Sequence, residues 1–276
     1  MVTEKETPAW RLIDVSYPSV HQNLALEEAL ARCMVSQESV PVIRMWRNPP
    51  SVIVGRFQQV SEEVDVEFCR ENGLAVARRF SGGGAVFHDY GVMSLSIIAP
   101  QTDPVNLNQM HRRNSSIVLD MLARRGMKGN LASPNSIHVN GRKICGAAAA
   151  AGQGYLLWHA SILISADTYK LERALAPSRV TKKTRSTRSI WHQVTTLSDE
   201  QGQAVNPEHV RATLIESCRS ILGSGIETSG LLDAEEKASR LLYEGKYSSD
   251  DWNWNGRWGT TEIVGRCEGA QTTIAV

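Results

Sequence analysis

The chain has 276 residues, of which 42% are hydrophobic, so it can fold around a full core and is not expected to be disordered. Thirty Lys and Arg against 29 Asp and Glu leave a net charge of +1, which gives no overall attraction to nucleic acid or to a membrane surface. Five widely spaced cysteines without a CxxC pair, a polar N-terminus and no long apolar run predict a cytoplasmic protein without a zinc or dithiol site.

Hydrophobic patterning predicts helices and short strands in alternation over the first hundred residues. A serine cap, acidic residues in the first turn and a following glycine predict one charged helix from Ser61 to Asn72. The Asn-Pro-Pro at 48–50 cannot continue a strand ladder, so it should separate two strands. The other elements expected here are a helix at 23–32 and strands at 41–46, 51–55, 74–79 and 93–99.

The rest of the chain contains a hairpin signal. Asn-Gly at 140–141 lies between the strand-like runs 136–139 and 142–146, and this dipeptide readily adopts the positive φ angles of a tight turn. An asparagine cap followed by proline predicts a helix over 206–222. Further expected elements are helices at 107–125, 166–175 and 233–243, a strand at 155–164, a basic loop at 177–188, and irregular packing or a short hairpin from 248 onward.

The order of these elements indicates the fold class. Several strand pairs are joined by turns too short for a parallel crossover, so a mixed, largely antiparallel central sheet flanked by helices is expected. This α/β (α+β) arrangement disfavours a doubly wound nucleotide-binding fold. No repeat or linker divides the chain, so we expect one domain over 1–255 and a tail or short hairpin over 256–276.

Three consecutive glycines at 82–84 follow directly on a predicted strand. Glycine has no Cβ to prevent positive φ or close approach, so the backbone N–H groups of such a loop can converge on a phosphate. Arg79 could add a forked positive charge beside them. The sequence around the loop matches neither a Walker A motif nor a dinucleotide fingerprint. By itself the run is equally compatible with a surface turn.

Five motifs in order resemble the lipoate–protein ligase family and its biotin ligase and octanoyltransferase relatives. RRFSGGGAVFHDYG at 78–91 looks like the family signature, and NGRKICGA at 140–147 is similar to the family's lysine motif. HASIL at 159–163 stands where members usually have His-Gly-Thr/Ser-Leu-Leu. The other two are VIVGRFQ at 52–58 and KYSSDDWN at 246–253. The resemblance covers roughly residues 10 to 255 and also includes a first helix at 23–30.

The resemblance implies the biotin/lipoate protein ligase catalytic-domain fold and an ATP-dependent ligase. Such an enzyme activates lipoate or octanoate as an acyl-adenylate and transfers the acyl group to a lysine of a lipoyl-carrier protein or domain. Lys143 would be its catalytic residue, since its ammonium can neutralise the carboxylate and the α-phosphate as charge develops. ATP with Mg²⁺ would be consumed, and no protein-bound metal, nucleic acid or membrane partner is expected.

Other site residues follow from the same resemblance, residue by residue. Trp46 or Val86 should form part of an apolar slot for the acyl tail. For His88 and His159, a structural role in the core stays open beside a binding role. The residues implied for ATP or the adenylate are Arg79, Gly84, Ala85, Val86, Phe87 and Lys143, and those for the acid are Lys143, Ser81, His88 and His159.

A basic run lies in a loop rich in Ser and Thr. The family suggests a mobile loop that closes over the adenylate, or a landing surface for an acidic carrier, and a plain exposed loop is the alternative. The run consists of Arg179, Lys182, Lys183, Arg185 and Arg188.

The sequence departs from the family pattern at several points. Val92 stands in place of a common Asn, Ser136 in place of an Asp and Ala160 in place of a Gly. The loss of the Asp is expected to alter magnesium or adenine handling, and with it the rate and the nucleotide preference rather than the reaction class. Too little chain follows Asn253 for the accessory domain of many ligases, so the protein should work without it or borrow it from a partner polypeptide.

Two rival functions remain open. A cysteine-dependent octanoyl or lipoyl transferase would need no ATP, and Cys145 is its only plausible nucleophile; by the period-two rule it would point to the same side as Lys143. In the related transferases of this family the cysteine precedes the lysine hairpin, and the corresponding segment here, 129–135, contains no cysteine. A non-catalytic acyl-binding homologue is the second rival, and the retained Lys143 and glycine loop argue against it.

Overall fold

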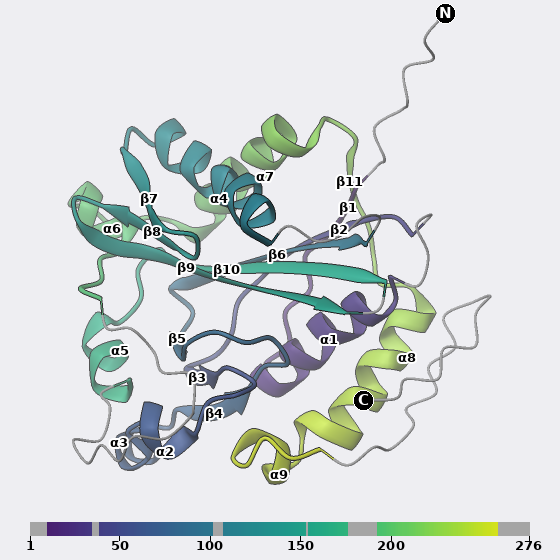
Figure 1. The fold of residues 1–276 in the computed structure, drawn as a ribbon. Coiled ribbons are helices and arrows are strands. Elements are labelled where there is room, and N and C mark those ends of the chain that lie inside the picture. The colour runs from purple at the N-terminus through teal and green to yellow at the C-terminus, as the bar shows by residue number, and fades with distance from the viewer. Residues whose placement is uncertain (1–9, 35–38, 102–106, 153, 176–191, 259–276) are drawn as a thin grey trace, which may run out of the picture.

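The computed structural model describes residues 10–34, 39–101, 107–152, 154–175 and 192–258. These residues form two sheets with helices packed around them (Figure 1). In the larger sheet five of the seven strand ladders are antiparallel, and only the pairs made by β1 are parallel. Its strands, in spatial order, are β11 (Ile226–Thr228), β1 (Trp10–Ile13), β2 (Val42–Trp46), β6 (Val92–Pro100), β10 (Tyr155–Leu163), β9 (Arg142–Gly152), β8 (Ser136–Val139) and β7 (Gly129–Ser133).

The smaller sheet has three strands and carries the glycine loop. β3 (Ser51–Val54) is its centre and pairs in parallel with β4 (Ala75–Arg78) and antiparallel with β5 (Val86–His88). The loop at 79–85 therefore connects the two outer strands across the end of β3. This mixed, largely antiparallel arrangement flanked by helices confirms the expected fold class.

Helices cover both faces of the large sheet (Figure 1). α4 and α7 pack together on one face, and α1 and α8 pack together on the other. Apolar side chains fill one core on each of these faces and a third core around the small sheet. The bounds are α1 (Val20–Arg32), α2 (Val60–Glu63), α3 (Val66–Glu71), α4 (Leu107–Arg124), α5 (Thr168–Ala174), α6 (Leu197–Gln201), α7 (Pro207–Leu222), α8 (Asp233–Leu242), a π-helical turn (Tyr243–Tyr247) and α9 (Asp250–Asn253).

The expected helix from Ser61 to Asn72 is wrong, because the chain breaks there into two short helices. Val64 between them is extended, with φ −129° and ψ 130°. Asp65 then caps α3, its side chain accepting a hydrogen bond from the N–H of Phe68 at 2.9 Å. Aspartate competes well for N–H groups at a helix start, so it opens a new helix rather than continuing one.

The lysine hairpin is confirmed in its local geometry. Asn140 has φ 50° and Gly141 has φ 78°, the positive values that a tight turn of this type requires. β9 runs on to Gly152, well beyond the expected end at 146, through a run of alanines that would favour a helix in isolation. The ladders with β8 and β10 on its two sides override that local preference.

The KYSSDDWN segment holds the C-terminal part of the described chain against the base of the glycine loop. Lys246 is buried and pairs with Glu28 of α1 at 2.8 Å, while its ammonium lies 3.9 Å from the centre of the Trp252 ring. The Arg78 guanidinium donates to the carbonyls of Trp252 and Trp254 and to three carbonyls of the 55–58 turn. The division at residue 255 stays a prediction, because the tail lies almost wholly outside the described residues.

Candidate active site

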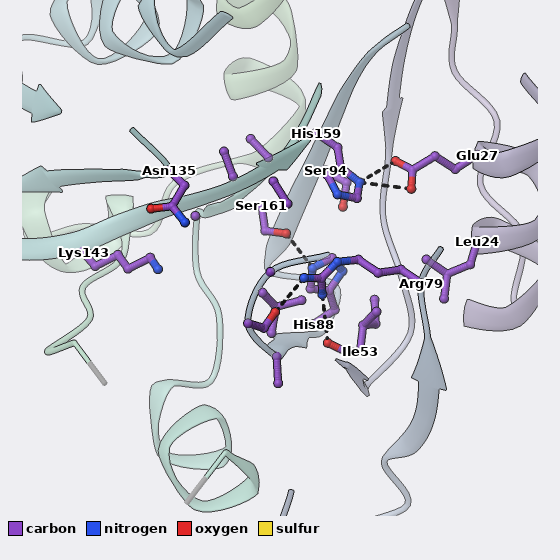
Figure 2. A pocket seen from close by; sticks show the side chains of 18 of the residues that line it. Leu24, Glu27, Ile53, Arg79, His88, Ser94, Asn135, Lys143, His159 and Ser161 are labelled. Atoms are coloured by element: carbon purple, nitrogen blue, oxygen red, sulfur yellow. Dashed lines mark hydrogen bonds and ion pairs between the residues drawn. The ribbon is translucent and has the colours of Figure 1, made fainter. Parts of the chain in front are cut away.

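A cavity of about 380 Å³ lies between the two sheets. We call Leu24, Glu27, Trp46 and His159 its inner end, and Asn135, Lys143 and His192 its outer end. Figure 2 shows Leu24 and Glu27 on one side of this space and Asn135 and Lys143 on the other. The remaining lining residues are Ile53, Arg79, Gly83, Gly84, Ala85, Val86, His88, Ser94, Ser133, Gly146, Ala147, Ala148, Ala160 and Ser161.

The glycine loop is built around the Arg79 side chain. Its guanidinium donates to the carbonyl oxygens of Gly82 at 2.6 Å and Gly84 at 2.8 Å, and also to that of Ile53 (Figure 2). Burial lowers the pKa of Arg79 to about 10, and the charge of Glu27 opposes this shift. Arg79 therefore holds the loop in shape through the loop's own carbonyl oxygens.

Two glycines are needed for the loop to close. Gly83 has φ 92°, which side-chain-bearing residues rarely adopt. Gly55 comes so near that a Cβ there would lie 2.2 Å from the carbonyl oxygen of Gly83. The glycine of the VIVGRFQ motif thus makes room for the glycine loop, which explains why the two motifs occur together.

Lys143 reaches the outer end of the cavity from the start of β9. The ladder between β8 and β9 slips at this point, so that Ile144 is left without a partner on β8. Lys143 and Gly146 consequently face the same side, and Lys143 Cε lies 3.1 Å from the position of a Cβ on Gly146. Burial lowers the pKa of Lys143, and within the described part of the chain no carboxylate pairs with its ammonium.

The same bulge turns Cys145 away from the cavity. An extra residue in one strand reverses the alternation of side chains beyond it, so the expectation that Cys145 shares the side of Lys143 is wrong. Cys145 is 1% exposed and lies in the core beneath α4 and α7. Burial raises the pKa of its thiol to about 12, although the charge of Lys143 opposes the shift. The other described cysteines, Cys33, Cys69 and Cys218, do not line the cavity either.

At the inner end, a buried carboxylate holds His159 in place. The His159 Nδ1 donates to both oxygens of Glu27, at 2.9 and 3.0 Å (Figure 2). Its Nε2 shares a hydrogen bond with the Ser81 hydroxyl at 2.9 Å, and Arg79 Nε donates to the same hydroxyl. Burial would raise the pKa of Glu27, but His159 and a hydrogen bond from Ser96 outweigh it and hold that pKa below its ordinary value.

His88 is fixed in a second network beside the cavity. Its Nδ1 accepts from the Asn48 amide at 2.9 Å, so its Nε2 carries the hydrogen and donates to the Ser161 hydroxyl at 2.7 Å (Figure 2). Burial lowers the pKa of His88 to about 3, helped by the charge of Arg79. The ring is therefore neutral, and the hydrogen bonds to two side chains give it a structural role while it still borders the cavity.

Most of the residues singled out from sequence meet at this cavity. Arg79, Gly84, Ala85 and Val86 line it, as do His88, Lys143, His159 and Trp46. Phe87 and Ser81 do not line it: the Phe87 side chain packs in the small-sheet core, and Ser81 acts through its hydrogen bond to His159. The roles of all these residues toward ATP or the acid stay predictions.

Several lining residues were not anticipated. Glu27 and Leu24 lie in the predicted first helix, Ser161 lies inside the HASIL motif, and Asn135 directly precedes a named departure. His192 had no sequence signal. A carboxylate on the apolar face of the first helix was the one signal available for Glu27, since a buried Glu needs a partner.

The basic run from Arg179 to Arg188 lies outside the described residues. Among those that the structure covers, no group of three or more His, Cys, Asp or Glu is placed to hold a metal ion. No helix of the described segments is long and apolar enough to cross a membrane.

Comparisons with known proteins identify the family. A sequence profile for the lipoyl protein ligase A/B catalytic domain matches residues 19–219, well over half of the chain. The chain belongs to this family, and it is an enzyme of the group that comprises lipoate ligases and octanoyltransferases. The family resemblance inferred from the five motifs is thereby confirmed.

Two relatives show the range of the family. Lipoate-protein ligase A subunit 1 of Thermoplasma acidophilum is 31% identical over 254 residues, which are 88% of this chain and 95% of the relative. Octanoyltransferase LipM of Symbiobacterium thermophilum is 28% identical over 267 residues, or 88% of this chain and 97% of that protein. Similarity therefore extends to both ligases and transferases.

Solved structures agree with the fold. A T. acidophilum putative lipoate protein ligase with bound lipoic acid superposes with a TM-score of 0.79 at 29% identity, covering 90% of this chain and 99% of that chain. A bi-partite lipoate protein ligase from the same organism, studied with its E2 lipoyl domain, gives 0.80 at 29% identity over 92% and 99%. A lipoate-protein ligase A bound with ATP gives 0.79 at 29% identity over 90% and 100%.

Proposed function

We propose that the protein is an ATP-dependent ligase that converts lipoate or octanoate into an acyl-adenylate and transfers the acyl group to a lysine of a lipoyl domain. The observation that carries this proposal is Lys143, a half-buried cation that no carboxylate neutralises among the described residues and that borders the same cavity as the glycine loop. An uncompensated ammonium at such a place is suited to a substrate with two negative groups.

The geometry suggests how the two substrates would be placed. The acid's tail would lie toward Leu24, Ile53 and Trp46, with its carboxylate directed to Lys143. The α-phosphate would meet the glycine loop at residues 84–86, a loop whose shape Arg79 sets by holding the carbonyls of Gly82 and Gly84. Lys143 would then hold the carboxylate and the α-phosphate together for in-line attack of the carboxylate on phosphorus. Its charge would lower the barrier as negative charge develops on the phosphate oxygens. Mg²⁺ would enter as the counter-ion of ATP.

The transferase alternative requires a cysteine at the cavity. None of the described cysteines lines it, and Cys145 is both buried and held as a thiol by its raised pKa. The ATP-bound and lipoate-bound neighbours support the ligase, whereas the LipM relative keeps the transferase as the alternative. Cys267 lies outside the described residues and is the thiol that an experiment must exclude.

The acceptor and an accessory partner are also part of the proposal. The bi-partite neighbour supports a lipoyl domain as acceptor and a separate accessory-domain polypeptide as a further partner. We place the enzyme in the cytoplasm, where ATP is available and thiols such as the four described ones stay reduced.

A single assay separates these possibilities. The purified protein is incubated with ATP, Mg²⁺ and lipoate or octanoate, with and without a lipoyl domain, while pyrophosphate exchange and carrier mass are followed. Exchange and an ATP-dependent mass shift, both lost in Lys143→Ala and kept in a Cys145→Ser/Cys267→Ser variant, are expected. Adenylate formation without transfer would point to a missing partner. Acyl transfer from an octanoyl carrier without ATP would overturn the proposal in favour of the thioester route.

A further inference from the structure

The outer end of the cavity carries a histidine directly beside Lys143. β10 pairs with β9 only as far as Cys145, and residues 193–195 take its place beyond that point. The Lys143 N–H donates to the Gln193 carbonyl at 2.8 Å, and the Lys143 carbonyl accepts from Thr195 at 2.9 Å. His192 comes just before this segment, and its side chain lines the cavity as that of Lys143 does.

His138 supports the His192 ring from the other neighbouring strand. On β8 it is the register partner of Lys143. Its ring meets His192 edge to face, with 5.4 Å between the centroids and 83° between the planes. Its Nε2 also shares a hydrogen bond with the Ser136 hydroxyl at 2.9 Å. His192 lines the cavity, and within the described segments its ring has the edge-to-face contact with His138 and no hydrogen bond.

Acyl transfer to a lysine needs a proton acceptor at this place. The acceptor side chain has an ordinary pKa of about 10.4, so it arrives as an ammonium without a free electron pair. The Lys143 amine cannot take this proton, because it must stay protonated to hold the phosphate. Glu27, His159 and His88, which also line the cavity, are all committed to partners inside the protein. Among the described residues that line the cavity, His192 is the remaining group able to accept a proton.

We propose that His192 is the general base that deprotonates the acceptor lysine, an inference that rests on the proposed ligase function. One proton of the ammonium passes to a ring nitrogen of His192, and the freed electron pair attacks the acyl carbon. The new C–N bond forms as the bond between that carbon and the AMP oxygen breaks, and AMP leaves with this electron pair. The second proton of the nitrogen passes to water, which leaves a neutral amide.

The surroundings of His192 suit this role. Burial lowers its pKa, and the positive charge of Lys143 and the neighbouring His138 lower it further. Those two are the titratable groups that face it in the part of the chain that the structure covers. The ring is therefore mostly unprotonated near neutral pH and can take up a proton in each cycle.

Two amines of different basicity test the proposal. n-Butylamine is protonated at neutral pH like a lysine side chain, whereas hydroxylamine is largely neutral. Octanoyl-adenylate formed on the enzyme is reacted with each amine, and the amide or hydroxamate is quantified by mass spectrometry. His192→Gln should lose about 100-fold in the reaction with n-butylamine and change little with hydroxylamine, because only the first amine needs a base.

Three controls make the result specific. ATP–pyrophosphate exchange should stay near the wild-type rate in His192→Gln, added imidazole should restore the reaction with n-butylamine, and His138→Gln should show a smaller loss. An equal loss with both amines, or no loss with n-butylamine, would overturn the assignment to His192. Failure of the wild type to exchange pyrophosphate would instead refute the ligase function itself, so the two failures are told apart.

Discussion

The inner and outer ends of the cavity differ in how their polar groups are satisfied. At the inner end, Glu27 has His159 and Ser96 as partners, and the nearby His88 has Asn48 and Ser161. At the outer end, Lys143 has no carboxylate partner among the described residues. A group whose partners come from the protein keeps its place whether or not substrate is bound. A charged group without a partner in the protein can form its strong electrostatic interaction with the substrate instead.

This comparison predicts that changes at the inner end affect stability first, and changes at the outer end affect activity first. Four experiments test that division, in order of decreasing expected effect. They pair residues that lie close together in the sequence or share a residue type but differ in surroundings.

The largest effect should come from His88 at low pH. The pKa of His88 is about 3 in the folded protein and has its ordinary value of 6.5 in the unfolded chain. Between these two pH values the unfolded chain binds a proton at His88 and the folded protein does not. Stability should be intact above about pH 6.5 and fall as the pH drops toward 3, with a full loss of about 5 kcal/mol. Denaturant unfolding at a series of pH values should show a shallower fall in His88→Gln. The exposed His209 is the matched control, and an unchanged slope in His88→Gln would contradict the assignment.

Lys143→Ala should reduce acyl-adenylate formation by about 1,000-fold, or about 4 kcal/mol of transition-state stabilisation. The melting temperature should hardly change, since no described carboxylate loses a partner. Lys143→Arg keeps the charge but spreads it over a planar fork, and should recover only part of the rate. A large drop in melting temperature for Lys143→Ala would show that this lysine is structural after all.

Glu28 is the sequence neighbour of Glu27, but its carboxylate binds Lys246 and Tyr247 and does not line the cavity. Glu28→Gln leaves the Lys246 ammonium buried without its counter-charge, which should cost about 3 kcal/mol of unfolding free energy. Pyrophosphate exchange per folded molecule should stay the same. Adding Lys246→Met should return part of the lost stability, and a double variant as unstable as the single one would contradict the pairing.

Cys145 should show the smallest effect, although it is only two residues from Lys143. Cys145→Ser places a hydroxyl in an apolar core and should cost about 1 kcal/mol, with Cys145→Ala as the control for volume. ATP-dependent ligation should continue at close to the wild-type rate in both variants. Abolished transfer in a folded Cys145→Ser protein would place the thiol in the reaction.

The sequence alone determined the features that depend on neighbouring residues. The tight turn at 140–141, the cap that starts α7 and the glycine loop each follow from local backbone chemistry. The five motifs led to the family because their order along the chain is itself sequence information. Short connections between strands were enough to predict a mixed, largely antiparallel sheet.

Which side chains face the cavity depends on contacts between distant parts of the chain. One unpaired residue at Ile144 separates Lys143 from Cys145, and the slip that leaves it unpaired depends on how β8 meets β9. Glu27 and His159 are 132 residues apart, and His192 reaches Lys143 because 193–195 continues where β10 ends. Contacts of this kind join segments far apart in the chain, so no local pattern of residue types can specify them.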